Sequence, residues 1–303
     1  MEIRGLIPAT VTPMTPDGEV DEASLRRYIG WLLEQGPHGV AVNVDTGEGP
    51  HLWPEERLRV LEIWAEEVAG RIPIVAGLGA TFTAQAVRAA RDARSAGATA
   101  LLVFPIPAFQ GTPLPPEVPY GYHAAVAEVG LPLVLFQLQP ALGGVLYPPD
   151  VVARLATIDG VVAIKEASFD ALVYTRTLRV LEGLDRPIAM LTGNDNFVGE
   201  SFVLGAAGAL IGFGTLATRS QVEMVDAFTG GDAERGLRIW RELLPLEEAV
   251  FAPPIRDYRA RTKAALAALG VIDHPTVRPP LTQADEQEVA AIRRLLEDAA
   301  VVG

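Results

Sequence analysis

Short apolar runs rich in valine, isoleucine and leucine alternate with longer amphipathic stretches over the first 230 residues of the chain. The alternation repeats about eight times, which predicts parallel strands that are each followed by a helix. We expect strands at 6–12, 39–44, 72–77, 100–105, 132–137, 161–167, 188–192 and 208–213. We expect helices at 23–35, 54–69, 83–95, 119–129, 149–156, 170–182, 195–204 and 218–229.

Eight strand–helix units of this size fit a closed (β/α)₈ TIM barrel of the α/β class. An open doubly wound sheet is the alternative, but no Gly-x-Gly-x-x-Gly follows the first strand, where a dinucleotide fold would carry it. After residue 230 the pattern predicts helices alone, near 232–249, 254–269 and 284–299. We therefore predict a single domain, with the barrel over 1–230 and a helical extension over 231–303 that packs on it.

The composition narrows the kinds of partner. No apolar run approaches the ~18 residues that span a bilayer, and the start Met1-Glu2-Ile3-Arg4 lacks the features of a signal peptide. The net charge is -13 and no basic stretch is present, which argues against nucleic acid. We expect a cytoplasmic protein that binds a small molecule.

The residues that usually bind metals are scarce. The chain has no cysteine, so thiolate sites and cysteine nucleophiles are excluded. Its four histidines are scattered, and none forms a pair at ligand spacing. The sequence therefore predicts no metal site.

Lys165 is the most informative residue. It is one of two lysines among 25 basic residues, and it lies in the apolar run 161–168. Burial disfavours an ammonium, so we expect the pKa of Lys165 to fall toward neutrality and leave an amine that forms imines with carbonyl compounds. The alternatives are that the side chain reaches out to water or pairs with Glu166. The second lysine, Lys263, is predicted to be a packing or surface residue on an amphipathic helix.

Polar motifs follow several of the predicted strands. Because barrel chemistry takes place where strands end, we expect these motifs to face one mouth. They are Asp45-Thr46-Gly47-Glu48, Gln137, Lys165, Gly193-Asn194-Asp195 and Gly212-Phe213-Gly214-Thr215.

Five motifs occur in one order across about 200 residues: Pro8-Ala9-Thr10-Val11-Thr12-Pro13, Thr46-Gly47-Glu48 with Pro54-Glu55-Glu56-Arg57, Ile164-Lys165-Glu166-Ala167-Ser168, Gly193-Asn194-Asp195, and Gly205-Ala206-Ala207-Gly208. Together they resemble the dihydrodipicolinate synthase/N-acetylneuraminate lyase family. The resemblance implies a Schiff-base lyase on a (β/α)₈ barrel that needs no metal or organic cofactor, and a homo-oligomer, either tetramer or dimer.

The resemblance also implies roles for individual residues. Lys165 would form the imine, while Thr46 and the backbone of Gly47 would bind the carboxylate of a 2-keto acid. The other implied pocket residues are Gly193, Asn194 and the carbonyl of Ile211.

The departures from the family pattern concern proton transfer. Phe136 stands where the family has its proton-shuttling tyrosine, and we expect Phe136 and Gln137 to line the substrate pocket. A second relay tyrosine is missing from Phe104-Pro105-Ile106-Pro107-Ala108, and Ala141-Leu142-Gly143-Gly144 lacks the substrate-binding arginine. Asp45 replaces a threonine and could supply the missing proton-transfer group, or could be a loop aspartate bonded to its own backbone. Gln137 could orient a substrate hydroxyl or be a structural amide.

We therefore predict a lyase that acts on a 2-keto acid. The segments 103–105 and 135–137 look like the branch that dehydrates 2-keto-3-deoxy sugar acids such as 2-keto-3-deoxy-L-arabonate, and a pyruvate-dependent aldolase fits equally. The alternatives are an authentic 4-hydroxy-tetrahydrodipicolinate synthase, a barrel that binds a keto acid without turnover, and a phosphosugar aldolase that uses the loop 212–215.

Overall fold

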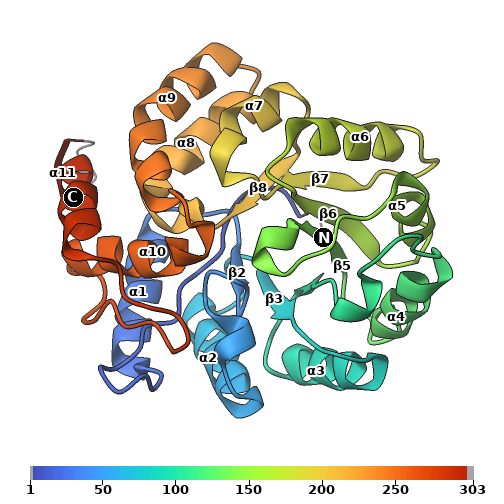
Figure 1. Ribbon diagram of the computed structural model, residues 1–303, viewed down its shortest axis with the longest axis horizontal. Helices are drawn as coiled ribbons and strands as arrows, with labels where there is room; N and C mark the ends of the chain where they lie inside the picture. The colour runs from blue at the N-terminus through green and yellow to red at the C-terminus, as the bar shows by residue number, and fades with distance from the viewer. Residues whose placement is uncertain (1–2, 299–303) are drawn as a thin grey trace.

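Eight parallel strands form a barrel at the centre of the computed structural model, which describes residues 3–298 (Figure 1). The strands follow the order β1-β8-β7-β6-β5-β4-β3-β2, and a parallel bridge between Ala9 and Ala41 joins the two end strands. Their bounds are β1 Gly5–Pro8, β2 Val40–Val42, β3 Ile74–Leu78, β4 Ala100–Val103, β5 Leu133–Leu138, β6 Val161–Ala167, β7 Ala189–Thr192 and β8 Gly208–Ile211. The predicted TIM barrel is confirmed.

A helix follows each strand and lies outside the barrel (Figure 1). These helices are α1 Glu22–Glu34, α2 Pro54–Val68, α3 Thr83–Ser95, α4 Glu117–Ala127, α5 Pro149–Leu155, α6 Ala171–Glu182, α7 Val198–Val203 and α8 Thr218–Thr229. The helix predicted at 195–204 is shorter than expected, because residues 195–197 form a 3₁₀ turn whose first residue carries a site carboxylate. The strand predicted at 6–12 ends early as well, at Pro8, and beyond it only Ala9 forms an isolated bridge, with Ala41.

The alternation of side chains along each strand divides the apolar residues into two layers. On β5, Val134 and Phe136 belong to the cluster inside the barrel, whereas Leu133 and Leu135 belong to the cluster between sheet and helices. The same alternation on β6 puts Ala163 and Ala167 inside. A residue's position along its strand therefore decides whether it can reach the barrel interior.

Three further helices follow the barrel: α9 Ala233–Val250, α10 Tyr258–Ala268 and α11 Glu286–Asp298. Helix α9 packs against α7 and α8, and α11 packs against α9 and α10 (Figure 1). The helix predicted at 254–269 begins only at Tyr258, because Pro253-Pro254 and a 3₁₀ turn over Ile255–Asp257 precede it. The predicted single domain and its boundary near residue 230 both stay predictions.

A buried ion pair fastens this extension to the barrel. Lys263 on α10 donates to Glu48 in the loop after β2 and also to the carbonyl of Thr276, at 2.7 Å. The side chains of Lys263 and Glu48 are both 0% exposed. Of the two environments predicted for Lys263, a packed position is confirmed and a surface position is excluded. The residue connects the extension to the rim of the barrel.

No helix within residues 3–298 is both long enough and apolar enough to cross a bilayer.

Replacing Glu48 with alanine should lower the free energy of unfolding by about 3–5 kcal/mol, because it leaves the Lys263 ammonium buried without its partner. Urea unfolding followed by circular dichroism measures the change. Glu234→Ala removes an ion pair with Arg238 in which the glutamate is 89% exposed, and it should cost no more than about 0.5 kcal/mol. Equal effects of the two substitutions would contradict the structural role of the buried pair.

Candidate active site

Lys165 points into the barrel from β6. The residue is 7% exposed, and its Nζ lies 4.6 Å from the centre of the Phe136 ring on the neighbouring strand β5. Within residues 3–298, Nζ has no hydrogen-bond or ion-pair partner. Glu166 faces the opposite side of the sheet, where its carboxylate accepts hydrogen bonds from Asn194 at 2.7 Å and from the backbone of Ser168 at 3.1 Å. Lys165 therefore neither pairs with Glu166 nor extends into solvent.

The surroundings of Lys165 favour its neutral form. Burial lowers the pKa of Lys165 to about 8, and the carboxylates of Asp195 and Asp45 oppose this shift by favouring the ammonium. The shift toward neutrality agrees with the expectation from the sequence. A much larger fraction of this side chain is a nucleophilic amine near neutral pH than for an exposed lysine.

Gly193 follows β7 and leaves the space that the lysine stem occupies. A Cβ atom at this position would lie 2.5 Å from Cε of Lys165 and 2.9 Å from Cβ of Ala167. Its backbone N–H is fixed by a hydrogen bond of 2.7 Å to the carbonyl of Glu166. Only glycine allows the backbone after β7 to pass this close to the lysine.

Thr46 and Gly47 lie in the loop after β2 and are held from two sides. The Thr12 hydroxyl donates to the carbonyl of Gly47 at 2.8 Å, and a Cβ on Gly47 would lie 2.7 Å from the carbonyl oxygen of Thr10. The Thr46 hydroxyl is 2% exposed and would lie 3.1 Å from a Cβ on Gly212, which follows β8. The loops after β1, β2 and β8 therefore meet beside the buried threonine.

Asp45 does not have either of the environments that the sequence suggested. Its carboxylate forms an ion pair with Arg259 and accepts a hydrogen bond of 2.8 Å from the Tyr258 hydroxyl. Arg259 also donates to the backbone carbonyl of Asp45 at 3.0 Å. Both partners come from α10, about 210 residues further along the chain. The carboxylate of Asp45 is thus bonded to α10 and not to its own backbone, and its proton-transfer role stays a prediction.

Gln137 faces the helix layer instead of the substrate. Its amide nitrogen donates to the Thr177 hydroxyl at 2.8 Å, and its oxygen accepts from the backbone of Tyr147 at 2.9 Å. The pocket role expected for Gln137 is therefore corrected to that of a structural amide. The reason is the strand alternation, which turns Phe136 inward and its neighbour outward.

Asn194 and Ile211 also bind the scaffold. The Asn194 amide donates to Glu166 and accepts from the backbone of Phe169 at 2.6 Å, which connects the loops after β6 and β7. The carbonyl of Ile211 accepts from the backbone of Ala9 at 2.9 Å. The Asn194 amide is thus bonded to the scaffold, whereas the carbonyl of Ile211 keeps a second lone pair and its pocket role stays a prediction.

Asp195 is a buried acid close to Lys165 that the site assignment from sequence left out. It is 4% exposed, and burial raises its pKa to about 7, although a hydrogen bond from the backbone of Phe213 and the charge of Lys165 act in the opposite direction. That hydrogen bond is 2.7 Å long and occupies an N–H of the loop 212–215. A carboxylate in this position disfavours the phosphate that a phosphosugar aldolase would bind there.

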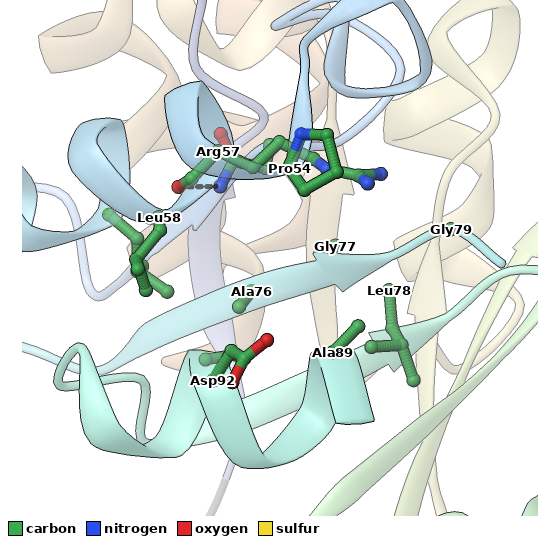
Figure 2. A pocket seen from close by; sticks show the side chains of 12 residues that line it. Pro54, Arg57, Leu58, Ala76, Gly77, Leu78, Gly79, Ala89 and Asp92 are labelled. Atoms are coloured by element: carbon green, nitrogen blue, oxygen red, sulfur yellow. Dashed lines mark hydrogen bonds between the residues drawn. The ribbon is translucent and has the colours of Figure 1, made fainter. Parts of the chain in front are cut away.

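A small surface pocket lies elsewhere, between α2, β3 and α3 (Figure 2). Its volume is about 60 Å³, and Arg57 and Asp92 line it from the two helices. It is on the outside of the sheet and separate from Lys165. Among residues 3–298, no group of three or more histidine, aspartate or glutamate side chains could hold a metal ion.

The comparisons with known proteins cover nearly the whole chain. The model of the dihydrodipicolinate synthetase family matches residues 2–299. The chain belongs to this family. It is 32% identical over 300 residues to the 4-hydroxy-tetrahydrodipicolinate synthase of Syntrophus aciditrophicus, covering 99% of each protein. It is 34% identical over 294 residues to that of Methanothrix thermoacetophila, covering 97% of this chain and 96% of the relative.

Solved structures agree with this assignment. The dihydrodipicolinate synthase of Thermotoga maritima superposes with a TM-score of 0.90 at 29% identity and covers 99% of this chain and 100% of its own. The Acinetobacter baumannii enzyme, solved in complex with pyruvate, gives a TM-score of 0.87 at 32% identity and covers 99% of both chains. The protein is accordingly a lyase of the class I aldolase type, which uses Schiff-base chemistry.

This member of the dihydrodipicolinate synthetase family has an apolar surface beneath its lysine. The rings of Phe104 and Phe136 pack edge to face with their centres 4.9 Å apart. A tyrosine from α10 reaches the loop after β2, because the Tyr258 hydroxyl lies 3.2 Å from the hydroxyl of Thr46. No local pattern in the sequence predicts this contact, because 212 residues separate the two.

Gly193→Ala should slow the reaction of Lys165 with pyruvate on the order of 100-fold, because the new methyl group displaces the lysine stem. Borohydride trapping followed by peptide mapping measures the rate. Gly121→Ala on α4 is the matched control, since a Cβ there meets no atom within 4 Å. A Gly193→Ala protein that reacts as fast as the control would show that the close approach is unimportant.

The labelling rate of Lys165 by acetic anhydride should rise with pH to half its maximum near pH 8, because only the deprotonated amine reacts. Asp195→Asn should move this midpoint to lower pH, since it removes a carboxylate that stabilises the ammonium. Asp150→Asn, at an exposed position on α5, should leave the midpoint unchanged. A midpoint near that of an ordinary lysine would rule out the buried, unpaired environment.

Proposed function

We propose that this lyase binds a 2-keto acid as an imine on Lys165, and that pyruvate is the smallest substrate it accepts. The observation that carries this proposal is a buried lysine with a pKa of about 8 and no partner among residues 3–298. The complex of the Acinetobacter baumannii relative with pyruvate supports the same substrate class.

The chemistry follows from the groups around the lysine. The amine of Lys165 attacks the C2 carbonyl, and the resulting carbinolamine loses water to give the imine. The backbone N–H groups of Thr46 and Gly47 would bind the carboxylate of the keto acid, because loop N–H groups can hold an anion without a formal charge. The imine then withdraws electrons from C3 and makes the C3–H bond acidic.

Two reactions of this imine are candidates. The names of the relatives favour authentic 4-hydroxy-tetrahydrodipicolinate synthesis, which condenses pyruvate with aspartate semialdehyde. The residues around the lysine favour a different reaction, catalysed either by a 2-keto-3-deoxy sugar acid dehydratase or by a pyruvate-dependent aldolase. Phe136 stands where the family has its proton-shuttling tyrosine, and the segment 104–108 contains no second tyrosine. The segment 141–144 contains no arginine for a second carboxylate. The relatives argue more directly for the synthase, and a direct assay of both reactions separates the two.

We further propose that the chain forms a homodimer or homotetramer in the cytoplasm. Trp53 and Phe82 precede α2 and α3 at the end of the barrel that holds Lys165, and they are 68% and 58% exposed. Exposed aromatic side chains of this size are typical of contact surfaces between subunits. A dihydrodipicolinate synthase variant 28% identical to this chain is described as monomeric, so association has to be measured for this protein.

Borohydride reduction in the presence of pyruvate should attach the keto acid to Lys165 of the wild-type protein and leave Lys263 unmodified. Lys165→Arg and Lys165→Met should both abolish the adduct and the turnover, because neither side chain can form an imine. Intact mass and peptide mapping detect the adduct. An adduct that persists in either variant would refute the assignment.

The same preparation should then be assayed with pyruvate plus aspartate semialdehyde and, separately, with 2-keto-3-deoxy-L-arabonate. Product from the first mixture alone would establish the synthase, and product from the second alone would establish the dehydratase. An adduct without turnover of either mixture would favour the barrel that only binds a keto acid.

A further inference from the structure

Tyr258 stands at the start of α10 and brings a phenol to the mouth of the barrel. The residue is 4% exposed, and its ring stacks on Phe251 with centres 4.8 Å apart and planes 19° apart. Its hydroxyl lies 3.2 Å from the Thr46 hydroxyl and donates to Oδ2 of Asp45 at 2.8 Å. A continuous line of hydrogen-bonding groups therefore runs from Thr46 through Tyr258 to Asp45.

Arg259, the next residue along the chain, holds the far end of this line. Its guanidinium pairs with the Asp45 carboxylate, bonds the backbone carbonyl of Asp45 at 3.0 Å, and lies 5.1 Å from the centre of the Tyr258 ring. Burial and the charge of Asp45 raise the pKa of Tyr258 well above its usual value. The phenol is therefore protonated before the reaction begins, and it donates its proton in the hydrogen bond to the Asp45 carboxylate.

This line of groups lies at the end of β8, which is the same end of the barrel as the end of β7, where Gly193 contacts the stem of Lys165. A Cβ on Gly212 would lie 3.1 Å from the Thr46 hydroxyl oxygen and equally far from the Tyr258 ring, so the two side chains line one space at the end of β8. The charge of Asp45 reaches Lys165, because it favours the ammonium form of that lysine. The strand that neighbours Lys165 presents the ring of Phe136 there, which has no proton to exchange.

We propose that Tyr258 transfers the proton of this lyase between Thr46 and Asp45, in place of a tyrosine on β5. This inference rests on the proposed imine with a 2-keto acid. When C3 of the imine is deprotonated, Thr46 accepts the proton and passes its own to Tyr258, which passes the phenolic proton to the Asp45 carboxylate. The electron pair of the C3–H bond forms a C2=C3 double bond, and the C2=N π pair of the protonated imine moves to the nitrogen, which gives a neutral enamine.

The proton returns along the same line in the second half of the reaction. In a dehydration it protonates the departing C4 hydroxyl as water, and in a condensation it protonates the aldehyde oxygen as the C–C bond forms. The line therefore ends each turnover in its starting state and needs no other reactant. It serves either candidate reaction, so the inference does not depend on the second substrate.

Tyr258→Phe tests this role, because it keeps the stacked ring and removes only the hydroxyl. We expect borohydride trapping of pyruvate on Lys165 to stay within about threefold of wild type, because imine formation does not use the relay. We expect the exchange of the pyruvate methyl protons with D₂O, followed by NMR, to fall about 100-fold or more in rate constant, with little change in the KM for pyruvate. Tyr174→Phe is the matched control, since it removes a buried hydroxyl on the outer layer that, within residues 3–298, bonds only the Ser201 carbonyl, at 3.2 Å.

Asp45→Asn provides a second measurement that leaves the phenol in place. It removes the carboxylate that takes up the proton, so exchange should fall while trapping persists. Normal exchange with intact trapping in either variant would overturn the role of Tyr258. A wild-type protein that neither traps pyruvate nor exchanges its protons would instead refute the proposed imine chemistry on which this inference rests.

Discussion

The two-residue alternation of side chains along β6 is the constraint on which the site depends. It directs Lys165 into the barrel and Glu166 into the helix layer, where Asn194 and the backbone of Ser168 hold the carboxylate. A shift of one residue in the register of β6 would exchange the two and place an acid inside the barrel. The closed ring of parallel strands prevents that shift, because β5 and β7 hydrogen-bond to β6 on either side.

The two lysines of the chain have different roles because their surroundings differ. Lys263 is fully buried and is bonded to Glu48 and to a backbone carbonyl, so its charge is used to hold the extension on the barrel. Lys165 is nearly as buried but has no such partner within residues 3–298. The pKa of Lys165 falls for this reason, because desolvation is only partly offset by the carboxylates nearby.

The C-terminal helices complete the rim of the barrel. Helix α10 sends Tyr258 and Arg259 to Asp45 and Lys263 to Glu48, so three side chains of one helix hold the loop after β2. This loop contains Thr46 and Gly47, the residues proposed to bind the keto acid. The extension therefore positions the proposed binding loop in addition to covering part of the barrel.

The sequence by itself determined the barrel, the three C-terminal helices and the position of Lys165 at the end of an inner strand. Those features depend on the period of apolar residues, and that period is local. Tertiary structure decided which polar groups remain available in the mouth. Gln137 and Asn194 lie where the sequence placed them along the chain, but hydrogen bonds to neighbouring strands and helices occupy their polar atoms. Tyr258 could not be assigned in advance, because only the folding of α10 onto the rim brings it to a threonine that is 212 residues away in the chain.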